Sequence, residues 1–127
     1  MKETFFSFES LEVWQKSRVL VSEIYRLVKL FPSYEHHALC DQIRRSVISV
    51  PSNIAEGSGR ASLKEKIHFI EIAFGSLMEV YCQLQLAVDL GYIKQDLFST
   101  ITPEIVSIAK MLTKLRSTFR SQISPTH

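Results

Sequence analysis

The sequence has few of the residues that build disulfide scaffolds, turns or unfolded chains. Its 127 residues include two cysteines, four glycines and four prolines. Two cysteines, Cys40 and Cys82, are too few for a disulfide framework and indicate a reducing compartment. With 46% apolar and 22% charged residues, the composition is typical of a compact soluble domain and excludes a collagen-like or disordered chain. The length fits one domain and is too short for two full ones.

The sequence also lacks a recognisable targeting segment and a strong net charge of one sign. Met1–Phe6 has one lysine, an early acid and no long apolar core, unlike a secretory signal. No run reaches the ~18 uninterrupted apolar residues of a membrane-spanning helix. A net charge of +2 does not by itself indicate nucleic-acid binding. We expect a cytoplasmic protein with no membrane partner. The kind of partner that it binds then depends on where its charged residues lie on the surface.

Apolar residues recur at helical spacing in four segments. The clearest repeat lies between Ser62 and Gly91, with spacings of four and three. Ser62-Leu63-Lys64-Glu65 fits a capping box, and Gly91 suits the left-handed residue that ends a helix. We expect helices over about 11–31, 36–57, 62–91 and 103–121. Because no alternating run or hairpin turn indicates a strand, the sequence predicts a single all-α domain over 1–127, an up-down-up-down four-helix bundle.

Pro51 lies inside the second expected helix. It removes the amide that would bond the Val47 carbonyl, and its ring clashes with that turn. We expect a kink at this point, relieved by the hydroxyls of Ser46, Ser49 and Ser52.

Thr102-Pro103-Glu104 has the pattern of a helix start. Thr102 suits the N-cap, Pro103 the first helical position and Glu104 the first turn. We therefore place the start of the last long helix at about 103, after a separate helical turn at roughly 95–100.

The third expected helix is apolar over most of its circumference. From Ile67 to Ile93 its only charged residues are Glu71, Glu79 and Asp89. Apolar or small residues also lie off the main apolar row: Phe69, Ile72, Ala73, Gly75, Ser76, Val80 and Ala87. Such a helix is buried on several sides, whereas a helix of an isolated four-helix bundle keeps one solvent side. A thick core with Phe69 lying flat is the alternative; we favour self-association.

Basic residues are concentrated in the last expected helix. After Glu104 the chain has four cations, Lys110, Lys114, Arg116 and Arg120, and no acid, whereas the part up to Glu104 has a net charge of −2. A stripe of one sign is suited to a phosphate backbone. The alternative is a solvated face whose cations favour the helix C-terminus.

A second basic group follows Gly57-Ser58-Gly59. Arg60, Lys64 and Lys66 lie near a helix start, whose free amides favour a phosphate. The spacing is not that of a Walker motif, because Lys64 lies inside the helix without the preceding glycine frame. We therefore do not expect a nucleotide site here.

Arg44 and Arg45 form a third basic point, in the middle of the second helix. One of the two must face the core or a subunit boundary, where Glu71 or Glu79 would neutralise it. We favour this structural role over ligand binding.

The sequence gives little support for catalysis. His36, His37 and Cys40 are the best metal candidates, but two ligands on one helix face without a second pair are a weak signal. Glu71 and Glu79 lack the Glu-x-x-His partners of di-metal bundles, and no Gly-x-Ser-x-Gly motif is present. We expect no enzyme activity, no catalytic residue, no metal and no cofactor.

Several motifs in order resemble one known family. They are Phe8-Glu9-Ser10-Leu11-Glu12-Val13-Trp14-Gln15-Lys16-Ser17, Gln42-Ile43-Arg44-Arg45-Ser46, Val50-Pro51-Ser52-Asn53-Ile54-Ala55-Glu56-Gly57, Gly59-Arg60, Gly75-Ser76-Leu77-Met78-Glu79 and Leu90-Gly91-Tyr92-Ile93. Over about residues 8–93 the chain resembles the four-helix-bundle family found in intervening sequences of bacterial 23S ribosomal RNA genes. The final helix matches only in apolar pattern and basic character.

The resemblance implies a ring-like homopentamer, in agreement with the apolar third helix. It also implies a relationship to the accessory protein of diversity-generating retroelements, a basic pentameric barrel that binds nucleic acid and a reverse transcriptase. The family brings no catalytic residues. Polar side chains beside a crowded helix need partners, so we expect structural or interface roles for the signature residues and their neighbours: Arg44, Arg45, Pro51, Asn53, Glu56 and Glu79.

Two functional hypotheses follow. The first is a non-enzymatic homo-oligomer that binds RNA, DNA or a ribonucleoprotein through its basic faces. Its leading contacts are Lys110, Lys114, Arg116 and Arg120, followed by Arg60, Lys64 and Lys66. The alternative is a protein-interaction scaffold, for a partner such as a reverse transcriptase, without nucleic-acid binding.

Overall fold

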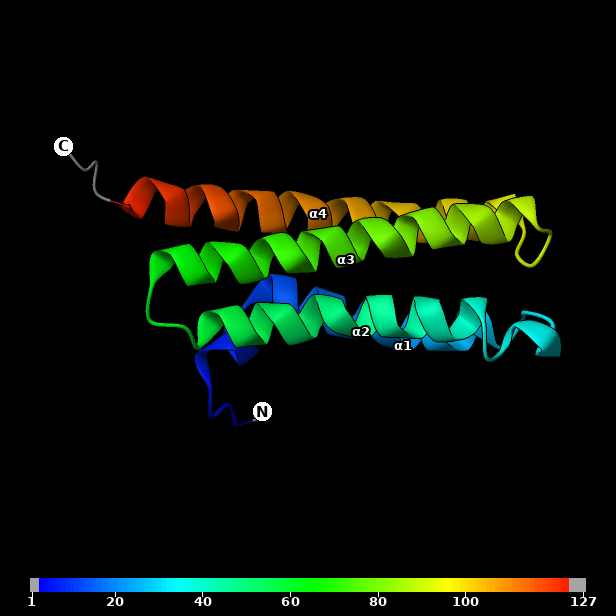
Figure 1. Cartoon of the computed structure of the whole chain (residues 1–127), viewed down its shortest axis with the longest axis horizontal. Coiled ribbons are helices and arrows are strands. Elements are labelled where there is room, and N and C mark those ends of the chain that lie inside the picture. Colours follow the sequence, from blue (N-terminus) through cyan, green and yellow to red (C-terminus); the bar gives the residue numbers. More distant parts are fainter. Residues whose placement is uncertain (1–2, 124–127) are drawn as a thin grey trace.

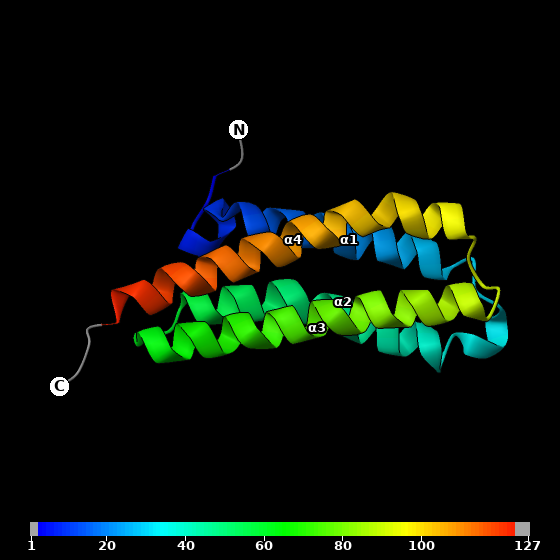
Figure 2. The same cartoon turned by 90° about the horizontal axis from the view of Figure 1, so that it is seen from above.

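The computed structural model describes residues 3–123 as four long helices packed side by side (Figure 1). They are α1 (Glu12–Val28), α2 (Leu39–Ser58), α3 (Leu63–Asp89) and α4 (Gln95–Gln122), with the short 3-10 helices η1 (Ser7–Ser10) and η2 (Ser33–Glu35) before α1 and α2. Each long helix packs against the next, and α4 returns to contact α1 (Figure 2). Successive helices run antiparallel, and residues 3–123 contain no strand.

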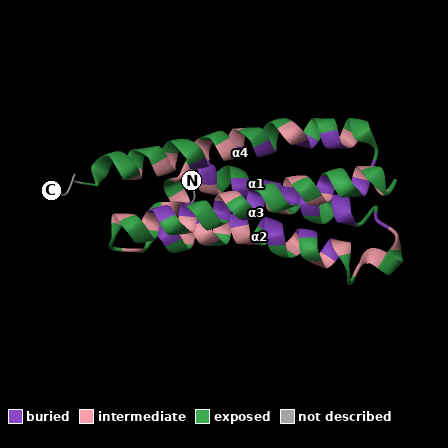
Figure 3. Ribbon diagram, turned by 45° about the horizontal axis from the view of Figure 1, so that its top comes forward, coloured by how far each residue is buried: buried purple, intermediate pink, exposed green. Residues whose placement is uncertain are grey.

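Side chains from all four helices meet in one apolar core. Burial follows the inward faces of the helices (Figure 3). The largest fully buried side chains include Leu20, Ile24, Ile43, Leu77, Leu84, Ile105, Ile108 and Leu112. Burying one such side chain stabilises the folded state by about 1.5–3 kcal/mol. The apolar residues that recur at helical spacing in the sequence therefore provide the packing between the helices. Over the same residues 3–123, no helix is both long and apolar enough to cross a membrane.

α3 begins after Ser62 and ends just before Gly91 as the sequence predicts, but of the expected capping box only the Ser62 bond is formed, without the return bond from the Ser62 amide to the Glu65 side chain. At the start, the Ser62 hydroxyl accepts a hydrogen bond from the Glu65 amide at 3.1 Å. At the end, Gly91 has φ 78° and the Tyr92 amide bonds to the Ala87 carbonyl at 2.9 Å. This is a Schellman ending, in which a left-handed glycine lets the chain turn back onto the helix.

The first two helices are shorter than the sequence predicts. α1 ends at Val28 rather than at 31, because the amides of Leu30 and Phe31 bond to carbonyls only three residues back. α2 begins at Leu39 rather than at 36, because Ala38 has a non-helical backbone with φ −123° and ψ −101°. Both corrections lie in the connection between the two helices.

The expected break before Pro103 is wrong: α4 is one helix that runs through this proline. Thr102 is not an N-cap, since its hydroxyl donates back to the Phe98 carbonyl at 2.8 Å. Phe98, Ile101 and Ile105 are all buried on one face of α4. Their burial on both sides of the proline offsets the lost amide and keeps the helix continuous.

α2 likewise continues through Pro51. Two of the three hydroxyls expected to relieve the proline, those of Ser46 and Ser49, make hydrogen bonds elsewhere. Ser46 donates to the Gln42 carbonyl at 2.9 Å, and Ser49 bonds to the Ser76 hydroxyl of α3 at 2.7 Å. These serines therefore connect α2 to its own preceding turn and to α3.

Candidate nucleic-acid interface

The structure brings the two predicted basic groups to one end of the bundle. The C-terminal half of α4 lies beside the first turns of α3 (Figures 1 and 2). Arg116 and Arg120 approach Glu71 of α3, and Lys66 Nζ lies 5.9 Å from the centroid of the Phe119 ring. We call this region the basic end, and it comprises Arg60, Lys64, Lys66, Lys114, Arg116 and Arg120.

Glu71 partly neutralises the α4 side of the basic end. Its Oε2 lies 3.1 Å from Nη2 of Arg120 and 3.7 Å from Nη1 of Arg116. The side chains are 43% exposed for Glu71, 57% for Arg120 and 30% for Arg116. Exposed pairs of this kind contribute no more than about 1 kcal/mol, so the arginines are not locked in place. One carboxylate between two guanidinium groups leaves a net positive charge.

Arg60 and Lys66 are held by contacts within the bundle. Arg60 pairs with Glu56 at 3.0 Å, and its guanidinium carbon lies 4.8 Å from the centroid of the Phe69 ring. Lys66 Nζ donates to the Ser58 carbonyl at 3.1 Å. Both side chains therefore have one favoured orientation, whereas Lys64 is exposed in the first turn of α3.

Lys110 and Lys114 border an apolar groove between α3 and α4 with a volume of about 620 Å³. Its apolar residues are Phe74, Met78, Tyr81, Ile105, Val106 and Ala109. Met78 is 38% exposed and Val106 42% exposed. Both lysines are exposed, so this part of α4 combines positive charge with uncovered apolar surface.

Arg44 has a different partner from the one expected. Its Nη2 donates to Asp41 Oδ1 at 2.5 Å and to the His36 carbonyl at 2.7 Å. The hydrogen bond from Arg44 lowers the pKa of Asp41. For Arg44 the acid is therefore neither Glu71 nor Glu79 but Asp41, which lies one turn earlier on the same helix.

Other signature residues form a polar seam between α2 and α3. Asn53 Nδ2 donates to the Ser49 carbonyl at 2.8 Å and to the Ser49 hydroxyl at 2.9 Å. The Ser46 hydroxyl lies 3.5 Å from Oε2 of Glu79. Asn53 is half-buried, while Arg45 and Glu79 are exposed at the edge of this seam.

The apolar residues of α3 divide into two groups. Ala73, Val80 and Ala87 are completely buried in the bundle's own core, so a thick core accounts for part of the pattern. Other apolar or small residues of this helix and its C-terminus are exposed: Ile72, Gly75, Met78, Cys82, Leu86 and Leu90. This second group forms an outer α3 face that the chain itself leaves uncovered.

The histidine and cysteine candidates do not converge. Cys40 is buried and lies with Sγ 3.7 Å from the Val28 carbonyl, and burial raises the pKa of this thiol. His36 is half-buried and His37 exposed. No three His, Cys, Asp or Glu side chains in the described part of the chain are placed to hold a metal ion.

Two side-chain pairs were not foreseen from the sequence. Glu23 of α1 meets Glu104 of α4, and burial together with this neighbour raises the pKa of Glu23 to about 7. The Tyr92 hydroxyl donates to Glu35 Oε2 at 2.5 Å. Both pairs join segments far apart in the chain, so no local spacing could have indicated them.

Comparisons with known proteins agree with this fold. A family model described as 23S rRNA-intervening sequence protein matches residues 9–114. A crystal structure of a protein with unknown function from the S23 ribosomal protein family of Bacteroides thetaiotaomicron is similar, with a TM-score of 0.74 and 25% sequence identity. The match covers 82% of this chain and 97% of that one. No curated protein matches the sequence. With most of its length matched by the model, the chain belongs to the 23S rRNA-intervening sequence protein family.

Proposed function

We propose that this protein is a non-enzymatic, cytoplasmic homopentamer that binds structured RNA through its basic end and the adjoining Lys110. The observation that carries the proposal is the convergence of cations from α3 and α4. Six cations form the basic end, and only Glu56 and Glu71 pair with any of them across the described residues. Phosphate contacts dominate nucleic-acid affinity, so this end is the part of the surface best suited to RNA.

The outer α3 face supports self-association. Exposed apolar residues that follow one helix face are typical of an interface between subunits. A closed ring would repeat the basic end once per subunit, and several modest sites on one RNA bind more tightly than a single site. Light scattering coupled to size exclusion measures the mass directly; a monomer at micromolar concentration would contradict the assembly.

The RNA proposal is tested by charge removal at matched positions. Lys110→Gln/Lys114→Gln removes two exposed cations of the proposed site, and Lys29→Gln/Lys94→Gln removes two exposed cations at the other end of the bundle. Fluorescence anisotropy with a labelled RNA hairpin, between about 50 and 200 mM salt, reports affinity and its salt slope. We expect the first variant to weaken binding and to lower the slope by about 2.

The control variant should bind the hairpin like the native protein. Equal loss in both variants would show that only net charge matters, and no loss in the first would place the RNA elsewhere. Absence of hairpin binding by the native protein at low salt would overturn the proposal.

The groove between α3 and α4 favours a second candidate, a protein-interaction scaffold without RNA binding. Its exposed apolar residues with Lys110 and Lys114 at the edge suit an acidic amphipathic helix of a partner. Under this alternative Val106→Ser, on the α4 side of the groove, weakens partner binding, whereas under the RNA proposal the same change leaves hairpin affinity within about twofold, because it alters no charge.

A further inference from the structure

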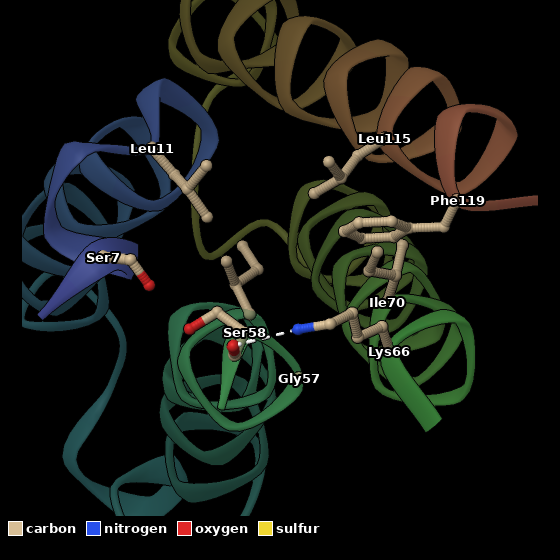
Figure 4. A pocket seen from close by; sticks show the side chains of 9 residues that line it. Ser7, Leu11, Gly57, Ser58, Lys66, Ile70, Leu115 and Phe119 are labelled. Atoms are coloured by element: carbon tan, nitrogen blue, oxygen red, sulfur yellow. Dashed lines mark hydrogen bonds between the residues drawn. The ribbon is translucent and has the colours of Figure 1, made fainter. Parts of the chain in front are cut away.

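A cavity of about 200 Å³ opens at the basic end of the bundle (Figure 4). Residues from η1, α2, α3 and α4 contribute to its wall, together with the residue that precedes α1. Its apolar wall consists of Leu11, Ile54, Ile70, Leu115 and Phe119. The cavity therefore lies where the apolar core of the bundle meets the basic surface.

Polarity changes from the inside of this cavity to its rim. Ile54 and Ile70 are 2% and 3% exposed, so the inner wall belongs to the core. Ser7 is exposed, and Ser58 and Lys66 are half-buried. In Figure 4 the Ser7 hydroxyl and the Lys66 ammonium group reach in from opposite sides. The cavity thus accepts a molecule with an apolar body and a polar head.

Lys66 determines which charge the polar head of a bound molecule should carry. Its Nζ donates one hydrogen bond, to the Ser58 carbonyl, and no carboxylate of residues 3–123 pairs with it. An ammonium group has three N–H donors, so two are available to a ligand. Arg116 and Arg120 stand nearby on α4 and share the single carboxylate of Glu71. The surroundings favour a negative head, and charge-assisted hydrogen bonds are about twice as strong as neutral ones.

The size of the cavity limits the body. An apolar cavity of about 150 Å³ holds a benzene-sized molecule, whereas sites for larger ligands measure about 300–1,000 Å³. A volume of about 200 Å³ therefore suits one ring or a short alkyl chain. We propose that this protein binds a small organic carboxylate at this end, with its hydrocarbon body against Ile54 and Ile70 and its carboxylate on Lys66.

The site does not rest on the proposed RNA function and is tested without RNA. Ligand-observed NMR and calorimetry with benzoate, benzyl alcohol and acetate separate the contributions of body and charge. We expect benzoate to bind about tenfold more tightly than benzyl alcohol, because only the carboxylate makes charge-assisted bonds. Acetate should bind far more weakly, because it has no body to bury. Acetate binding as tightly as benzoate would overturn the proposal in favour of a simple anion site.

Variants locate the ligand. Lys66→Met keeps the apolar stem and should abolish the preference for benzoate over benzyl alcohol. Lys64→Met is the matched control and should retain that preference, since Lys64 does not line the cavity. Ile70→Phe fills the interior and should remove binding of both probes; Leu115→Phe, on the half-buried wall, provides the same test if the first variant unfolds. Unchanged preference in Lys66→Met, or unchanged affinity in a folded filled variant, would refute the site.

Discussion

Glu23 of α1 and Glu104 of α4 meet across the seam between the first and last helices of the bundle. Burial is the main cause that raises the pKa of Glu23, followed by the hydrogen bond to Glu104 and the charge of that carboxylate. Arg26 opposes the shift without cancelling it, and the pKa of Glu23 reaches about 7. At pH 7 the Glu23 carboxyl group is therefore protonated in about half of the folded population.

This pair makes stability depend on pH. In the unfolded chain Glu23 titrates near its ordinary value of 4.5, whereas in the folded chain its pKa is about 7. Its contribution to the free energy of unfolding is fully present below pH 4.5 and is lost as the pH rises through 7. At pH 8 we expect Glu23→Gln to be more stable than the native protein by about 1 kcal/mol, after allowance for solvent screening.

Urea unfolding at pH 5 and pH 8, followed by circular dichroism, measures this effect. Glu12→Gln, on the same helix, is the control and should follow the native pH dependence. A Glu23→Gln protein that loses as much stability between the two pH values as the native protein would refute the role of the pair.

Gly57 allows α2 to approach α3 closely. A Cβ at this position would lie 2.9 Å from Cβ of Phe69, closer than two carbon atoms can pack without movement of a helix. We expect Gly57→Ala to lower the free energy of unfolding by about 1–3 kcal/mol. Gly59→Ala is the control, because its Cβ would meet only the Glu56 carbonyl at 3.7 Å and its φ is −88°. Thermal unfolding that is equal in the two variants would contradict a packing constraint at Gly57.

Much of the fold could be predicted because it depends on local spacing. The apolar rows gave four helices in the right order, and the cap at Ser62 and the turn at Gly91 were recognisable from residue type alone. The end of α1 and the start of α2 were misplaced by three residues, because short turns on either side of η2 interrupt the helical bonding. Helix ends of this kind depend on tertiary packing as much as on sequence.

Less of the candidate site could be predicted from the sequence, because its contacts join residues far apart in the chain. The cations of α4 were visible, but their neutralisation by Glu71 joins positions 49 residues apart in the case of Arg120. The meeting of Glu23 with Glu104 has the same origin. Glu104 was interpreted as a first-turn acid because Thr102 and Pro103 carry the signature of a helix start, and the burial around them overrode that local signal.

Pro103 therefore lowers the stability of α4. A proline inside a helix costs about 3 kcal/mol relative to alanine, through the missing amide and the clash with the preceding turn. Pro103 is exposed, so its replacement leaves no cavity. We expect Pro103→Ala to raise the free energy of unfolding by about 1–3 kcal/mol in urea titrations. Thr113→Ala, also exposed on α4, controls for helix propensity and should gain only about 0.6 kcal/mol. Equal gains would mean that the proline is accommodated without cost.

Glu71 limits the positive charge of the basic end, because its carboxylate lies 3.1 Å from Arg120 and 3.7 Å from Arg116. Glu71→Gln removes that charge and frees both guanidinium groups for phosphates. If the basic end binds RNA, this variant should bind a hairpin about three- to tenfold more tightly at low salt, with a salt slope steeper by about 1. Loss of the exposed ion pairs should change the free energy of unfolding by less than about 1 kcal/mol.

Asp89→Asn is the matched control for Glu71→Gln, because it removes one exposed acid at the other end of α3. A tighter complex in Glu71→Gln alone would show that the gain comes from the two arginines it releases. Equal gains in both variants would show that RNA responds only to net charge and has no fixed site at the basic end. Unchanged affinity in Glu71→Gln would exclude Arg116 and Arg120 from the RNA contacts and leave Lys110, Lys114 and the α3 lysines as the remaining candidates.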